Sequence, residues 1–140
     1  MVEVYLWSGF PGHVSLKVDG GSPGGIMYLS RFPASQGAKI GGGGINQTYA
    51  QDLAEYGAPS IVRLTRLNET AVKRAVAEAQ KAMIYSAFVA NCASHVKFCL
   101  DSGGSVLLGA VTHGGLIGSS LTDTPQGVHA YAQGLRALYG

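Results

Sequence analysis

Apolar and polar residues alternate along the first part of the chain, as they do in half-buried β-strands. Residues 2–7 (VEVYLW) and 13–18 (HVSLKV) both follow this period of two. Glycine, serine and proline over residues 19–25 predict a turn, which leads into a third strand over residues 26–32. The pattern therefore predicts a β-meander, and residues 60–64 predict a fourth strand.

Helical spacing replaces this alternation further along the chain. A short helix is predicted over residues 49–56, and the Gly-Ala-Pro sequence after it ends that helix. Asn68 can cap a second helix, and Thr124 followed by Pro125 can begin a last one. The apolar positions of the second helix are Val72, Ala75, Val76, Ala79 and Met83. Those of the last helix are Val128, Tyr131, Ala132, Leu135, Leu138 and Tyr139. Strands followed by helices predict an α+β fold, with an antiparallel sheet packed against helices.

A third long helix is predicted to begin at Cys92, with Asn91 as its N-cap. Its apolar face combines Cys92 with Val96, Cys99 and Leu100. The glycine pair at residues 103–104 is the predicted stop of this helix.

Two glycine-rich segments show neither the alternation of a strand nor the spacing of a helix. Four consecutive glycines at residues 41–44 are costly to order, so residues 33–47 are predicted to form a surface loop. Residues 105–121 are apolar but are interrupted by polar residues, and they are short for a bilayer span. We therefore expect a core-facing loop or strand there and no stable membrane span.

Composition limits the classes of function. The chain has 140 residues, of which 46% are hydrophobic and 13% are charged, so one domain over residues 1–140 is expected. The net charge of +2 is spread without a basic stripe, which argues against a nucleic-acid partner. The first residues lack the basic start and long apolar run of a signal peptide, so synthesis in the cytoplasm is expected.

The two cysteines do not predict a disulfide. Cys92 and Cys99 lie seven residues apart on one predicted helix, a rise of roughly 10 Å, which exceeds the reach of a disulfide. Neither belongs to a CxxC pair, and no His, Cys and Asp cluster has the spacing of a zinc site. We predict free thiols, no metal and no cofactor.

The candidate chemistry lies in Cys92 and His13. A cysteine in the first turn of a helix lies beside unpaired backbone N–H groups, which favour the thiolate over the thiol. A histidine on a strand can accept the thiol proton and later return it to a leaving group. The two residues are far apart in the sequence, so only folding can join them. His95, one helical turn after Cys92, is the competing base.

These residues resemble the circularly permuted NlpC-like branch of the papain fold, including its bacterial members and the lecithin:retinol acyltransferase-like proteins. The matching segments are GHVSL at 12–16, YLSRFP at 28–33, Asn91-Cys92 with Val96 four residues later, and Thr124-Pro125. The acyltransferases carry Glu-His-Phe after the cysteine, where this chain has Ala93-Ser94-His95. The resemblance covers most of the chain, and to the acyltransferase subgroup it is partial.

The resemblance implies a permuted papain-like fold and a thiol hydrolase. Cys92 would attack an amide bond in a peptide, a protein or cell-wall peptide, with His13 as the base. Some bacterial members are secreted toxins or effectors, which implies export by a specialised secretion system and an immunity or delivery protein as a partner. Deamidation and lipid acyl transfer by the same dyad remain alternatives. A non-catalytic binding module is another, and so is a membrane-active toxin acting through residues 105–121.

In this branch, the group that orients the histidine lies on the following strand. Ser30 is the candidate there, with Tyr28 behind it. The Cys92 backbone N–H would serve the oxyanion. Trp7, Tyr28 and Asn91 are the candidate substrate contacts. Two further histidines, His113 and His129, are expected at the surface.

Overall fold

The computed structural model describes residues 1–8, 12–19, 25–33, 40–81, 84–86, 92–105 and 124–139. Four antiparallel strands form the main sheet, in the order β3-β2-β1-β6. They are β1 (Val2–Trp7), β2 (His13–Val18), β3 (Met27–Leu29) and β6 (Ser60–Leu64). The predicted strands at residues 2–7, 13–18 and 60–64 are confirmed.

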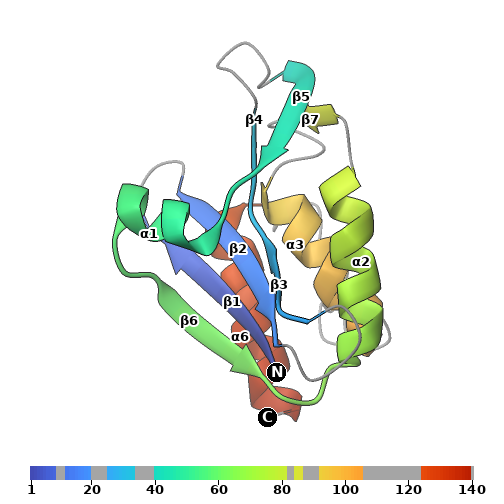
Figure 1. Cartoon of the computed structure of the whole chain (residues 1–140). Coiled ribbons are helices and arrows are strands. Elements are labelled where there is room, and N and C mark those ends of the chain that lie inside the picture. Colours follow the sequence, from blue (N-terminus) through green and yellow to red (C-terminus); the bar gives the residue numbers. More distant parts are fainter. Residues whose placement is uncertain are drawn as a thin grey trace.

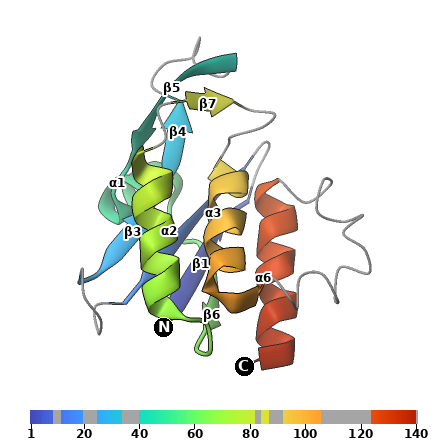
Figure 2. The same cartoon turned by 90° about the vertical axis from the view of Figure 1, so that its right-hand side faces the viewer.

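Helices cover both faces of this sheet (Figures 1 and 2). On one face lie α2 (Glu69–Lys81), α3 (Cys92–Leu100) and α6 (Pro125–Tyr139). The short helix α1 (Tyr49–Tyr56) lies over the other face. It has the predicted bounds and begins with a capping box between Thr48 and Gln51. The coarse prediction of an α+β fold with an antiparallel sheet is therefore confirmed.

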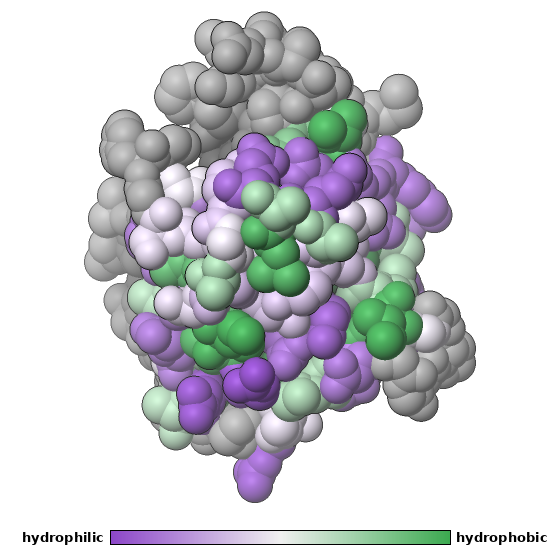
Figure 3. Space-filling model, turned by 60° about the vertical axis from the view of Figure 1, so that its left-hand side comes forward, coloured by the Kyte–Doolittle hydropathy of each residue, from purple (hydrophilic) through white to green (hydrophobic). Residues whose placement is uncertain are grey.

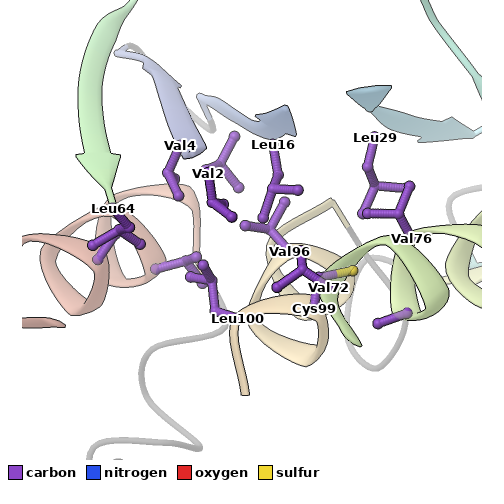
Figure 4. Close-up of a cluster of buried hydrophobic side chains, with 14 of the residues drawn as sticks. Val2, Val4, Leu16, Leu29, Leu64, Val72, Val76, Val96, Cys99 and Leu100 are labelled. Carbon is purple, nitrogen blue, oxygen red and sulfur yellow. The ribbon is translucent and has the colours of Figure 1, made fainter. Parts of the chain in front are cut away.

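The core lies between the main sheet and the three longer helices. Alternate strand residues such as Val4 and Leu16 point from the sheet toward Val96 and Leu100 of α3 and Val76 of α2 (Figure 4). Each of these five side chains is buried. Because strand side chains alternate between faces, the residues between the core positions all project toward the α1 side.

The glycine run is part of a strand, so the predicted loop over residues 33–47 is wrong in its second half. Strand β5 (Ile40–Asn46) pairs with β4 (Arg31–Pro33) on one side and with β7 (Ile84–Ser86) on the other. β4 pairs with residues 44–46 of β5, and β7 pairs with residues 40–43, so backbone pairing that needs no side chain orders the glycine run. The predicted third strand is likewise divided: Ser30 separates β3 in the main sheet from β4 in the second sheet.

The glycine pair after α3 does not stop the helix, which is a second correction. The chain continues as a π-helical turn, η2 (Asp101–Ser105). Gly103 is needed there for close packing, because a Cβ at this position would lie 2.6 Å from Cγ2 of Val72. The Gly103 carbonyl also accepts a hydrogen bond from the Asn68 N–H.

Within the described ranges, no helix is long and apolar enough to cross a membrane. Most of the apolar segment at 105–121 lies outside the described residues, and so do Met83, Asn91 and His113.

Candidate active site

The α1 side of the main sheet carries polar and aromatic residues opposite each other on neighbouring strands. Trp7 of β1 pairs with His13 of β2, and Tyr5 pairs with Ser15. All four side chains are buried. The alternation HVSLKV explains this placement: Val14 and Leu16 face the core, so His13 and Ser15 must face α1.

His13 is held from its Nε2 atom. The Oγ atom of Ser30 lies 2.9 Å from this nitrogen, which confirms the predicted contact between the two side chains. Ser30 is fully buried in the break between β3 and β4. A carboxylate oxygen of Asp52 lies 3.7 Å from the same nitrogen.

The sequence-based interpretation missed Asp52. It considered only the strand after His13 as the source of an orienting group, whereas Asp52 comes from α1, where it is the one fully buried residue. A signal was present in the spacing of Tyr49, Asp52 and Tyr56, which places the acid on the same face of a short helix as two aromatic residues. A carboxylate between aromatic positions on a helix that covers a sheet points inward.

Tyr28 holds Asp52 in place. Its hydroxyl donates to Asp52 Oδ2 at 2.5 Å and lies 2.7 Å from the Ser15 hydroxyl. Tyr28 was predicted as a substrate contact and as the alternative orienting group for His13. In the structure its hydroxyl contacts the carboxylate behind the histidine.

These contacts shift the pKa values of the buried pair, Asp52 and His13. Burial alone would raise the pKa of Asp52, but its interactions with His13, Tyr28 and Ser30 outweigh burial and lower that pKa. Burial alone would lower the pKa of His13, but its interactions with Asp52 and with Cys92 outweigh it and raise that pKa. A carboxylate and a readily protonated imidazole therefore lie side by side.

Folding brings Cys92 to the same imidazole. Cys92 is the first residue of α3 and is almost buried, with 8% of its surface exposed. Its side chain lies close enough to His13 to raise the pKa of the imidazole. Since Nε2 faces Ser30 and Asp52, the thiol would have to approach the other ring nitrogen, Nδ1.

Cys99 lies two turns further along the same helix, and burial is the only cause of its pKa shift. It is fully buried in the core, and burial raises its thiol pKa to about 12. Both thiols are free, as predicted. Cys92 belongs to the same core cluster, so the two thiols differ in that Cys92 lies at the helix start and interacts with His13.

Aromatic rings enclose the imidazole. Phe32 stacks on His13 with ring centroids 4.1 Å apart, and Trp7 and Tyr56 lie at 5.6 Å and 5.7 Å. Trp7 is 3% exposed and donates its indole N–H to the Gly57 carbonyl. It therefore forms a wall behind the histidine, whereas Tyr56 is 41% exposed and forms its outer cover.

The other described histidines lie in different environments. Burial, and then the charge of Arg31, lowers the pKa of His95, and Cys92 does not contribute to that shift. The predicted surface position of His129 is wrong, because α6 turns this residue into its packed face, where it is 7% exposed and burial lowers its pKa.

No group of three His, Cys, Asp or Glu side chains in the described part of the chain could hold a metal ion. Comparisons of the chain with protein-family models, with curated proteins and with solved structures each found no match.

Proposed function

We propose that this protein is a cysteine hydrolase that cleaves an amide bond through an acyl-enzyme on Cys92. The observation that carries the proposal is the environment of His13: its Nε2 lies beside a buried serine and a buried carboxylate, and the thiol at the start of α3 raises its pKa. Nucleophile, base and orienting group in this order are the parts that nucleophilic acyl transfer needs.

In the proposed reaction, His13 accepts the Cys92 proton and the sulfur forms a bond to the amide carbonyl carbon. The first N–H groups of α3 have no partner inside the helix, so the Cys92 N–H can donate to the resulting oxyanion. The C–N bond then breaks, and His13 gives its proton to the leaving amine. Water, deprotonated by His13, attacks the thioester, and the C–S bond breaks to restore the thiol.

Ser30 and Asp52 act as positioning residues in this proposal. The protonated Nε2 donates to Ser30 Oγ, and the Ser30 hydroxyl in turn interacts with Asp52. This arrangement directs Nδ1 toward the thiol and stabilises the imidazolium formed when the thiol loses its proton.

The proposed architecture is the permuted papain-like fold. It is supported by the chain order, in which a strand histidine precedes a helix-start cysteine, and by the packing of α3 on β2, the strand that carries His13. Peptide, protein or cell-wall amides are the proposed substrates, and export as a bacterial effector with an immunity or delivery partner remains part of the proposal. Deamidation and lipid acyl transfer would use the same groups and differ in their products, which mass spectrometry distinguishes.

The proposal is tested with p-nitrophenyl acetate, an activated ester. A thiol enzyme should release a burst of nitrophenolate equal to the enzyme concentration, and an acetyl group should be found on Cys92 by peptide mass spectrometry. A steady release without a burst, or acetyl groups on lysine only, would rule out the acyl-enzyme.

Replacing Ser30 with alanine should slow acetyl transfer about fivefold, because one buried neutral hydrogen bond contributes roughly 1 kcal/mol. Alkylation of Cys92 should change little, since the thiol and the imidazole both remain. Ser15→Ala is the matched control: it also removes a fully buried hydroxyl, but one whose partner is Tyr28. Equal activity of Ser30→Ala and wild type would remove Ser30 from the mechanism.

Replacing Asp52 with asparagine should lower the pKa of His13 and change how stability depends on pH. The raised pKa of His13 stabilises the fold fully below 6.5, the ordinary value, and this stabilisation is lost as pH rises through the folded value. The lowered pKa of Asp52 stabilises the fold above 3.8, and this is lost as pH falls through the folded value. The difference in unfolding free energy between wild type and Asp52→Asn should therefore be largest between these two pH values.

Urea unfolding at pH 5 and pH 9 measures this difference. We expect the deficit of Asp52→Asn to be clearly smaller at pH 9. A deficit that stays constant over this range would show that Asp52 and His13 are not coupled.

A further inference from the structure

We propose that Tyr56, Phe32 and Ile45 form an apolar strip that selects an apolar side chain on the leaving-group side of the scissile bond. This inference rests on the proposed function and adds a substrate class to it. The strip begins at the catalytic histidine and ends at the protein surface.

The three residues are joined by stacking and by strand register. The rings of Tyr56 and Phe32 are nearly parallel, with an interplanar angle of 5° and centroids 6.0 Å apart, and both stack on His13. Phe32 of β4 lies directly opposite Ile45 of β5. Side chains of directly opposed residues project from the same face of a sheet, so Ile45 extends the surface that Phe32 begins.

The strip is open to solvent at its outer end. Tyr56 is 41% exposed and Ile45 is 42% exposed, in contrast to the buried Trp7 behind the histidine. On the face of the molecule in Figure 3, apolar residues form separate patches among polar ones. Exposed apolar side chains next to a catalytic group can mark a ligand-binding surface.

The three residues of the strip are themselves uncharged, although Glu55 interacts with the Tyr56 hydroxyl. The neighbours of Phe32 and Ile45 along their strands, Arg31 and Asn46, project from the opposite face of the second sheet and hydrogen bond to each other at 2.9 Å. Both also donate to the Gln80 carbonyl of α2. An apolar side chain therefore suits the ring faces of the strip, where a charged side chain would lose its hydration.

The contact with His13 assigns the strip to the leaving group. In the proposed reaction, the imidazole hands its proton to the departing amine, so this amine leaves past the ring and the residues that stack on it. By microscopic reversibility, an amine that attacks the acyl-enzyme enters along the same path.

Amine acceptors therefore test the strip directly. The enzyme is acetylated with p-nitrophenyl acetate in the presence of L-phenylalaninamide, L-lysinamide or glycinamide. The amine nitrogen forms a bond to the thioester carbonyl, His13 takes the amine proton, and the C–S bond breaks. The yields of acetylated amide and of acetate, measured by mass spectrometry, give the rate of each acceptor relative to water.

We expect phenylalaninamide to react about five- to tenfold faster than glycinamide, because this ratio corresponds to the stabilisation that one aromatic contact provides. Tyr56→Ala should remove this preference, and Ile45→Glu should shift it toward lysinamide. Phe98→Ala, which removes another exposed helical aromatic residue, is the control and should retain the wild-type preference.

Two failures can be told apart. If Cys92 is acetylated but the three acceptors react equally, or if Ile45→Glu leaves their order unchanged, the strip is overturned and the proposed hydrolase stands. If no acetyl group forms on Cys92, the hydrolase is overturned and the strip with it.

Discussion

Replacing Cys92 with alanine is expected to abolish the acetyl burst, because the atom that would carry the acyl group is gone. The protein should still fold: the change removes one sulfur atom from a nearly buried position, at a cost of about 1 kcal/mol. The burst assay measures the first effect and urea unfolding the second.

Cys99→Ala is the matched control for this variant. It removes the same atom from the same helix at a fully buried position, so it should lose a similar amount of stability and keep the burst. A burst that survives in Cys92→Ala, or one that disappears in Cys99→Ala, would contradict the assignment of the nucleophile.

Replacing His13 with glutamine is expected to slow acylation by about 10²- to 10⁴-fold, the usual contribution of a general base. Glutamine preserves part of the side-chain volume and leaves a polar partner for Ser30 and Asp52, so the carboxylate is not left as an unpaired buried charge. Burst kinetics on folded protein, verified by circular dichroism, provide the measurement.

His95→Gln is the corresponding control, because His95 also lies on α3 close in sequence to Cys92. It should acylate at close to the wild-type rate, since the pKa shifts of His13, and not those of His95, include Cys92 as a cause. Slow acylation in His95→Gln together with normal acylation in His13→Gln would transfer the role of base to His95.

Sequence patterns predicted the main sheet and its helices because each element carries its own signal. Alternation fixed β1 and β2, and it also placed His13 on the face away from the core. The helical spacing of Val72, Val76 and Ala79 predicted α2, and these side chains are buried, as is Lys73, which the spacing did not predict. These features depend on local periodicity, which is visible in one sequence.

The second sheet could not be predicted in this way. Glycines provide no alternation, and β5 is a strand because β4 and β7 pair with both of its edges. Likewise, Gly103 looked like a helix stop, but its real constraint is the approach of Val72 from another helix. Both features depend on partners that are distant in the sequence.

The candidate site shows the same division. Cys92 and His13 were predicted from their places on a helix and a strand, Ser30 was predicted from the resemblance to the permuted papain-like branch, and the contact of His13 with Ser30 is confirmed. Asp52 was missed because the spacing of α1 places the acid on an aromatic helix face but does not specify that this face packs on the strand carrying His13.

Alkylation of the native protein tests the central claim most directly. Wild-type protein is treated briefly with iodoacetamide at neutral pH, and peptide mass spectrometry measures the modified fraction of Cys92 and Cys99 separately. We predict rapid modification of Cys92, at a rate that falls in His13→Gln, while Cys99 is spared because its pKa of about 12 keeps it protonated. Equal modification of the two thiols, or a Cys92 that reacts at the same rate with and without His13, would contradict the proposed nucleophile and base.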